Sequence, residues 1–484
     1  MKVERRMLGN VAVLGTGELL AQFSNFVFVV VIARAFGPGL LGHYSLSMAV
    51  AAIVMVFISF GTLQLHVRNI GRNAHEGGEL LRTLFPVQVL LAFVAWIGII
   101  SVGTAFRLSP TELGVLAAIA AYQFLVRLMG ILLTEPQGRQ QMRAVAIAHA
   151  GLPIATLCAT GFLVWLNYDP VVTLSVLPCF ALMFVLFAAR TAAQLGGPIR
   201  LHWNACAVVA GVREARPFFA AMLLSSAYER LGIIILGLFA SSEMVGEFAA
   251  GERIVAALGV VVGVVTTVAL PALSSLAASD KVRLMQVANR LVRLAWLFGL
   301  PLATVISLFK SEIIDLVFGE SYSGSSAVLG IVSVLIAIRA IRAVLAPMAM
   351  ATGQPGLLVF ARATALLTLI CGAPLLVNGY GAQGLAATMV LAETILLAVL
   401  ATRLAASGNL PEIVSPALRI AGACGAAYAV GLLVVEWPLA QRVTAALFAG
   451  LSGLWAFRAV RANDIEFVMT LIRTGAPSDE GAQD

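Results

Sequence analysis

The chain has 484 residues, of which 60% are hydrophobic and 11% are charged, and its mean hydropathy is +0.97. Soluble domains carry roughly a quarter of charged residues, so this composition excludes a soluble globular protein and indicates an integral membrane protein. The net charge of +7 does not indicate nucleic-acid binding, because the basic residues lie in short segments between apolar runs and form no stripe. The five cysteines are scattered without metal-ligand spacing, which predicts neither a disulfide framework nor a metal site.

Apolar runs of about 20 residues, each long enough to cross roughly 30 Å of hydrocarbon, recur along the chain. The predicted spans are 10–33, 41–63, 84–106, 113–134, 144–166, 171–190, 217–240, 244–270, 293–317, 326–347, 356–377, 381–404, 418–436 and 438–457. The sequence therefore predicts an all-α integral membrane protein with about fourteen transmembrane helices.

Arginine and lysine residues are distributed unevenly between the two ends of these runs. With the amino terminus in the cytosol, 21 of them fall in cytosolic segments and four in outer segments. Cytosolic loops of membrane proteins carry an excess of Lys and Arg. The imbalance therefore predicts that both termini of this multi-pass protein are cytosolic.

A weak internal repeat divides the chain. The segment GPGLLGHYSLSMAV at 37–50 aligns with SSEMVGEFAAGERI at 241–254 at an offset of 204 residues, and Gly42 then matches Gly246. Each segment joins the first and second runs of a six-run block, which predicts two related lobes about an axis along the membrane normal. The expected parts are an N-terminal lobe over 1–190, a cytosolic amphipathic linker over 191–216, a C-terminal lobe over 217–404, two further helices over 405–457, and a cytosolic, partly disordered tail over 458–484.

Four segments resemble a known family. They are IARAFGPGLLGHYSLSMAV at 32–50, FAAGERIVAALGVVVGVVTTVALPALSSLAA at 248–278, LVFGESYSGSSAVLGI at 316–331 and GAQGLAATMVLAET at 381–394. They are similar to Wzx-like polysaccharide flippases of the multidrug/oligosaccharidyl-lipid/polysaccharide (MOP) superfamily. The resemblance implies two six-helix lobes around a central cavity, which opens alternately to the two sides of the membrane and moves an oligosaccharide linked to polyprenyl pyrophosphate.

One departure from the superfamily bears on the cargo. The lipid II flippase branch has arginines in its first helix, and the corresponding positions here are Gln22 and Phe28. The resemblance therefore favours the branches that handle O-antigen, capsule or exopolysaccharide units. It also makes the polysaccharide polymerase and export machinery candidate partners, alongside the lipid bilayer itself.

Ten charged residues lie within the predicted spans, and each costs about 2.5 to 3.5 kcal/mol at a helix centre unless it has a partner. They are Glu18, Arg127, Glu229, Arg230, Glu252, Arg253, Arg339, Arg342, Arg362 and Glu393. The six arginines outnumber the four glutamates. This excess favours a site for an anion such as a pyrophosphate.

Arg253 is the main candidate for binding the pyrophosphate, because it lies too deep to reach the interface easily and its planar guanidinium fits phosphate oxygens. Neighbouring residues on a helix point about 100° apart, so Glu252 does not pair well with Arg253. A buried ion pair between Glu229 and Arg253 without a ligand role is the open alternative. Further candidates for the phosphates are Arg230, Arg127, Arg339 and Arg342.

A polar stripe runs along the first span. Glu18, Gln22 and Asn25 follow one another at helical spacing and share one face, which we expect to line a cavity and meet polar groups of the cargo. Glu229, Glu252 and Glu393 are candidates for ion coupling or for ion pairs. The sequence does not decide whether Glu393 is protonatable or pairs with Arg339 and Arg342.

The sequence contains no Walker-type loop and no paired catalytic motif, so we expect a transporter that is not an enzyme and uses no cofactor. Coupling to Na⁺, to H⁺ or to the membrane potential stays open. Two other functions remain as alternatives. A drug or cation antiporter of the same superfamily would be expected to have twelve spans and an acidic cavity, and a membrane glycosyltransferase or glycan polymerase would need a large outer loop.

Overall fold

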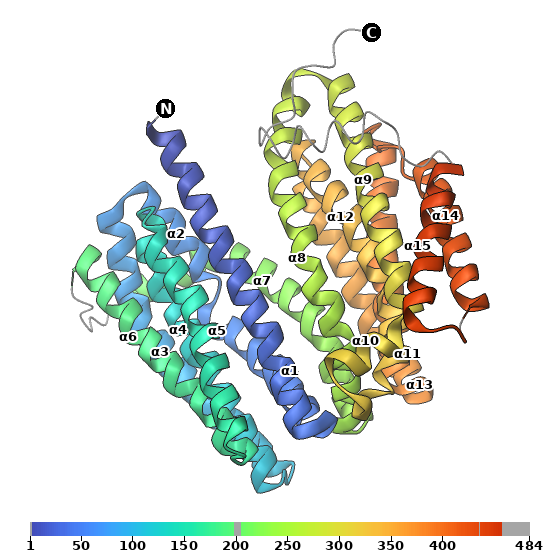
Figure 1. Ribbon diagram of the computed structural model, residues 1–484. Helices are drawn as coiled ribbons and strands as arrows, with labels where there is room; N and C mark the ends of the chain where they lie inside the picture. The colour runs from blue at the N-terminus through green and yellow to red at the C-terminus, as the bar shows by residue number, and fades with distance from the viewer. Residues whose placement is uncertain (1, 198–204, 435, 457–484) are drawn as a thin grey trace. The chain divides into compact units, whose positions relative to one another are not determined.

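The computed structural model describes residues 2–197, 205–434 and 436–456, and these residues form helices joined by short connections, with no strand among them (Figure 1). The tail expected over 458–484 lies outside this range. The helices are α1 (Lys2–Ser59), α2 (Thr62–Arg72), α3 (Ala74–Ala105), α4 (Pro110–Gly138), α5 (Met142–Trp165), α6 (Pro170–Gly196), α7 (Ala205–Phe239), α8 (Ser242–Ser279), α9 (Lys281–Leu308), α10 (Lys310–Val317), the 3₁₀ turn η1 (Glu320–Tyr322), α11 (Ser325–Val332), α12 (Val334–Ala351), α13 (Pro355–Ala406), α14 (Val414–Leu433) and α15 (Leu439–Ala456).

Two of these helices each contain two of the predicted spans. The backbone leaves helical geometry at Gly37 in α1, where φ is 78°, and at Gly381 in α13, where φ is 54°. Glycine adopts such positive φ values without steric cost, so each helix divides into two arms at this residue. Ten helical stretches of the described residues are long and apolar enough to cross a bilayer, with α11 and α12 counted as one. The breaks in α1 and α13 divide two of them, which makes twelve segments, and α8 and α15 are long enough to add two more. The prediction of an all-α membrane protein is confirmed.

The chain forms two compact units, Met1–Ala249 and Ala250–Asp484. The expected division lay earlier, in a linker over 191–216. The structure continues α6 to Gly196 and begins α7 at Ala205, and it packs α7 against α1. A side chain at Gly61 would overlap the backbone of Phe219, and one at Gly237 would lie 2.8 Å from Leu46 Cδ1. These two glycines let α7 lie close to α1, which explains why the seventh span joins the first unit.

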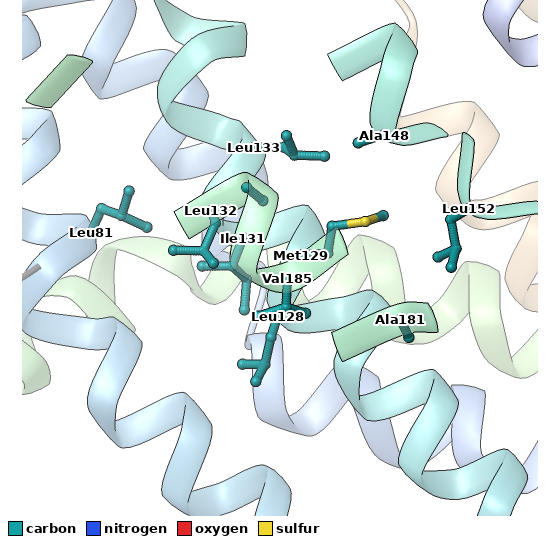
Figure 2. Close-up of a cluster of buried hydrophobic side chains, with 11 residues drawn as sticks. Leu81, Leu128, Met129, Ile131, Leu132, Leu133, Ala148, Leu152, Ala181 and Val185 are labelled. Carbon is teal, nitrogen blue, oxygen red and sulfur yellow. The ribbon is translucent and has the colours of Figure 1, made fainter. Parts of the chain in front are cut away.

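Small residues allow close packing in the core of the first unit. Leu128, Leu132 and their neighbours on α4 lie against α5 and α6, where Ala148 and Ala181 are fully buried (Figure 2). Lipid tails are as apolar as leucine, so van der Waals packing rather than water exclusion holds such helices together. Helix α4 packs mainly against α6, whereas α5 packs mainly against α1.

The repeat predicted from the sequence appears as a reciprocal contact within the first unit. A side chain at Gly42 would overlap the carbonyl group of Ser242 and lie 3.0 Å from Gly246 N. A side chain at Gly246 would overlap the carbonyl group of Pro38 and lie 3.1 Å from Gly42 N. Pro38 and Ser242 are separated by the same 204 residues as the two glycines. The second arm of α1 and the start of α8 therefore cross at equivalent positions of the repeat.

We expect Gly42→Ala to lower stability, because its methyl group overlaps a backbone carbonyl that cannot move without separating the two helices. Forcing extra volume into a close-packed contact typically costs about 1 to 3 kcal/mol. The measurement is the thermal midpoint of the purified protein in detergent. Gly39→Ala on the same arm is the matched control, since its methyl group would come no nearer than 3.8 Å to another residue, and an equal loss in both variants would contradict the crossing.

His66 on α2 is a buried titratable group outside the membrane-spanning segments. Its side chain is fully buried, and neither ring nitrogen has a hydrogen-bond partner in the described part of the chain. Burial lowers the pKa of His66 to about 3. An unfolded histidine takes up a proton near pH 6.5, so His66 lowers stability progressively as the pH falls from about 6.5 toward 3.

His66→Leu is therefore expected to reduce the loss of stability in acid. Between pH 7.5 and pH 5, His66 contributes a destabilisation of about 2 kcal/mol, at 1.36 kcal/mol per pH unit below pH 6.5. The thermal midpoint of the detergent-solubilised protein, followed against pH, measures this contribution. His149→Leu removes a more exposed imidazole and should retain the wild-type loss; an unchanged loss in His66→Leu would show that other groups cause it.

Candidate functional site

The polar stripe of the first span is exposed on the surface of the first unit. Glu18 and Gln22 are exposed on α1, Asn25 is partly buried one turn further along, and Gln22 Nε2 donates a hydrogen bond to Glu18 Oε1 at 2.9 Å. The bond holds the two side chains together along the helix. Polar groups in this position on an apolar helix need water or a polar ligand beside them.

His149 on α5 extends the stripe to a second helix. Its Nδ1 atom lies 3.8 Å from Glu18 Oε2. The two helices approach closely here because Gly17 has no side chain, and a methyl group at this position would lie 3.3 Å from Ala146 Cβ. The sequence analysis missed His149, although a histidine in the apolar run VAIAHAGLP was a signal for it. Glu18 and His149 together form an acid–base pair among spanning helices.

Arg127 lies inside the first unit on α4. Its side chain is partly buried, and within the described residues it has no hydrogen bond or ion pair. Helix α4 continues eleven residues beyond Arg127, about 16 Å at 1.5 Å per residue, before it ends at Gly138. A guanidinium in this environment is stabilised by an anion or by water. Arg127 is therefore suited to meeting an anionic ligand.

Glu252 and Arg253 lie near the start of the second unit and are both partly buried on α8. The preceding residue, Gly251, faces α11, where a side chain on it would lie 3.1 Å from Val328 Cγ1 and 3.2 Å from Leu329 N. Successive helical residues are rotated by about 100°, so Arg253 points to the side of α8 roughly opposite α11. Its assignment to phosphate binding stays a prediction.

Glu229 and Arg230 occupy α7 in the first unit. Glu229 is exposed and Arg230 is partly buried. Arg253 belongs to the second unit, so the ion pair that the sequence left open between Glu229 and Arg253 also stays a prediction. Phosphate binding by Arg230 also stays a prediction.

Glu393 is the partner of two arginines in the second unit. Glu393 Oε1 lies 3.3 Å from Arg339 Nε on α12 and 3.3 Å from Arg342 Nη1 on the same helix. The carboxylate itself comes from the second arm of α13. The sequence left open whether Glu393 pairs with these arginines, and the structure shows that it does.

A second buried carboxylate, Glu135, was missed in the sequence. It lies at the end of α4 and is almost completely buried, and its Oε1 atom lies 2.9 Å from Arg139 Nε and 2.8 Å from Arg139 Nη2. A side chain at Gly196 would lie 2.5 Å from the same oxygen and 2.6 Å from Arg82 Nη2. The glutamate–arginine spacing of four residues in TEPQGR was the available signal. The pair therefore lies at the end of α4, and the absence of a side chain at Gly196 lets α6 approach it closely.

Comparisons with known proteins identify the family and the fold. The sequence profile described as "Polysaccharide biosynthesis protein" matches residues 7–277, which is more than half of the chain. A comparison with curated protein sequences finds no match.

Several solved structures are similar to the chain. The structure of the lipid II flippase MurJ in an inward closed conformation has a TM-score of 0.75 at 12% identity, and the match covers 95% of this chain and 100% of that one. An inward-facing multidrug resistance MATE transporter of the MOP superfamily has a TM-score of 0.64 at 13% identity, over 80% and 95% of the two chains.

A third similar structure is a MOP superfamily transporter from Pyrococcus furiosus, described as having a binding pocket of reverse polarity. Its TM-score is 0.58 at 13% identity, over 83% of this chain and 96% of that one. At these identities the likeness shows a common fold. The profile match confirms the resemblance found in the sequence and shows that the chain belongs to the polysaccharide biosynthesis protein family, and its fold is the one seen in MurJ and in MATE transporters.

Proposed function

We propose that the protein moves an oligosaccharide linked to polyprenyl pyrophosphate across the bacterial cytoplasmic membrane, for the synthesis of O-antigen, capsule or exopolysaccharide. Membership of the polysaccharide biosynthesis family and the flippase-type fold support a cargo of this class. The protein acts as a transporter without covalent chemistry, and both of its termini lie in the cytosol. The lipid bilayer, a polysaccharide polymerase and the export machinery are its partners.

The observation that carries this proposal is the excess of arginine inside the spans. The spans contain six guanidinium groups and four carboxylates, and Glu393 Oε1 lies 3.3 Å from both Arg339 Nε and Arg342 Nη1. Arg127 has no counter-charge among the described residues. Because a guanidinium in an apolar bundle is costly without an anion, a negatively charged cargo supplies the missing partner.

The mechanism leaves the polyprenyl tail in the lipid, while the pyrophosphate and the sugars cross through the protein. Arg253 is the main residue proposed to bind the pyrophosphate, and Arg230 and Arg127 are further candidates for its phosphates. The stripe of Glu18, Gln22 and Asn25, extended by His149, meets the hydroxyl groups of the sugars. The hydrophilic cargo is then spared contact with hydrocarbon, in which its polar groups have no partners.

The first span also bears on which glycan is carried. Gln22 and Phe28 stand where the lipid II branch has arginines, and Phe28 is buried in the structure. This uncharged pair favours the O-antigen, capsule and exopolysaccharide branches over lipid II. The driving force is the membrane potential, worth about 2.3 kcal/mol per charge per 100 mV, or exchange of Na⁺ or H⁺.

A drug or cation antiporter has the same fold and is the second candidate. A cavity that attracts organic cations requires carboxylates in excess, whereas arginines outnumber glutamates in the spans of this chain. A glycan polymerase is the third candidate. The outer segments predicted from this sequence are short, whereas such enzymes use a large outer loop. The charge balance therefore favours an anionic cargo.

We expect Arg253→Gln to abolish export of the lipid-linked oligosaccharide without lowering the amount of folded protein, because the amide cannot offer the charged fork that binds the pyrophosphate. The native host lacking the gene is complemented with each variant, and lipid-linked glycan in the two leaflets is measured by periodate oxidation of sealed and permeabilised spheroplasts. Arg107→Gln, which changes an exposed arginine in a connection between helices, is the matched control and should restore export.

The alternatives give other results in the same strain. If the protein is a flippase, deletion of its gene should cause lipid-linked glycan to accumulate in the inner leaflet. Unpolymerised glycan in the outer leaflet would indicate a polymerase, and unchanged glycan with new sensitivity to organic cations would indicate an antiporter. Full export by Arg253→Gln would remove Arg253 from the mechanism, and a variant that only fails to fold would favour a structural ion pair.

A further inference from the structure

Helix α2 is a short amphipathic helix that follows the second arm of α1. Phe60 and Gly61 separate the two helices, and both have positive φ values, 47° and 73°. The eleven residues of α2 extend about 16 Å, which is too short to cross roughly 30 Å of hydrocarbon. A short helix between two spans lies at the membrane interface, which in the proposed topology is the cytosolic one.

One face of α2 is buried and the other is polar. Leu65 and Ile70 are buried, and the helix packs against α3 and α4. Gln64, Arg68 and Arg72 follow one another at intervals of four residues along the other face, and Gln64 and Arg72 are exposed. The arginines of α2 are therefore directed away from the core of the first unit.

Helix α2 lies beside the beginning of α7 and runs in the opposite direction. Arg68 Nη2 donates a hydrogen bond to Glu214 Oε1, and Arg68 Cζ lies 5.7 Å from the centre of the Phe218 ring. Nearer the start of α2, Gly61 lies against the backbone of Phe219. These contacts hold the two helices together as one surface.

Three further arginines are exposed around this contact. Arg72 is one helical turn beyond Arg68, and Arg213 and Arg216 precede and follow Glu214 on α7. None of the three has a hydrogen bond or ion pair with another residue in the described part of the chain. Arg68, Arg72, Arg213 and Arg216 are called the α2–α7 basic surface below.

Carboxylates are fewer than arginines on this surface. Glu214 is bonded to Arg68, and Glu79 is exposed on α3, which packs against both helices. At the adjoining end of α4, Arg139 is already paired with Glu135. The described charges around α2 and the start of α7 are therefore predominantly positive.

The position of the arginines along α7 places them at the depth of lipid phosphates. The apolar run of this helix begins directly after Arg216, and Pro217 and Ala220 are exposed. The exposed surface thus changes from basic to apolar between Arg216 and Pro217, as it does where a spanning helix enters the hydrocarbon. A guanidinium at this level meets phosphate oxygens, which it binds through two parallel N–H groups.

We propose that the α2–α7 basic surface binds the phosphates of anionic phospholipids of the inner leaflet through Arg72, Arg213 and Arg216, while Arg68 holds α2 beside α7. The headgroup of phosphatidylcholine carries its own cation, which competes with the arginines, whereas that of phosphatidylglycerol does not. The inference goes beyond the proposed function, because these lipids are resident partners and not cargo. It relies on the proposed topology for the choice of leaflet.

The test is native mass spectrometry of the full-length protein in neutral detergent, titrated with dioleoyl phosphatidylglycerol or dioleoyl phosphatidylcholine. We expect the wild type to bind phosphatidylglycerol about tenfold more tightly than phosphatidylcholine. Arg213→Gln and Arg216→Gln should each weaken phosphatidylglycerol binding about fivefold, the contribution of one arginine near an anionic lipid surface. Arg107→Gln, which changes an exposed arginine between α3 and α4, is the matched control and should bind as the wild type does.

Two further variants separate lost charge from lost structure. Arg213→Lys keeps the charge and should retain most of the affinity. The combined variant Arg72→Gln, Arg213→Gln and Arg216→Gln should show no preference between the two lipids, at an unchanged thermal midpoint in detergent. Equal binding of the two lipids by the wild type, or a wild-type preference in the combined variant, would overturn the assignment.

Inorganic phosphate and farnesyl diphosphate distinguish the other sources of a phosphate group. Neither should displace phosphatidylglycerol from the wild type when added at the same concentration. Displacement by inorganic phosphate would indicate a site for any small anion, and displacement by farnesyl diphosphate would assign the surface to the cargo. Either result would overturn the assignment to a resident phospholipid.

The lipid measurement is independent of transport. Failure of the lipid preference would leave the export results for gene deletion and for Arg253→Gln unchanged. Normal export after deletion of the gene would overturn the proposed function and leave the lipid preference intact.

Discussion

The cost of placing a charge among apolar helices is the constraint on which the rest of this structure depends. A charge at the centre of a spanning helix costs about 2.5 to 3.5 kcal/mol on insertion scales. Each such residue therefore needs a counter-charge, water or a bound ligand. The chain meets this constraint in two ways. Glu393 on α13 is buried against two arginines of α12, whereas Glu18 and His149 remain exposed on the surface of the first unit. The first arrangement holds helices together, and the second leaves polar groups free to meet a ligand.

Close backbone approaches set the positions of the helices that carry these charges. The second arm of α1 crosses the start of α8 at Gly42 and Gly246, and near its other end Gly61 lies against the backbone of Phe219 on α7. Neither contact tolerates a side chain, so the arm is held at both ends within the first unit. A transport cycle that moves this arm has to separate one of these contacts, at the expense of the van der Waals packing that holds membrane helices together.

The sequence predicted the features that depend on composition and local pattern. Apolar run length gave the fourteen spans, and the offset of 204 residues gave the two glycines that meet in the structure. It could not choose a partner for Glu393, because the choice depends on the distance between α12 and α13. It missed His149 for the same reason, since the place of His149 beside Glu18 depends on how α5 packs against α1, whereas the pairing of Glu135 with Arg139 was readable from their spacing.

The account's central claim is that guanidinium groups within the spans guide an anionic, lipid-linked glycan across the bilayer. The most direct test is translocation by the purified protein in liposomes that contain a lipid-linked oligosaccharide with a reducible fluorophore on the sugar. The account predicts that dithionite added outside bleaches well beyond the half of the fluorophore that starts in the outer leaflet, because cargo from the inner leaflet continues to reach the outer one. Bleaching that stops at one half, as in protein-free liposomes, under every imposed potential and Na⁺ or H⁺ gradient, would contradict it.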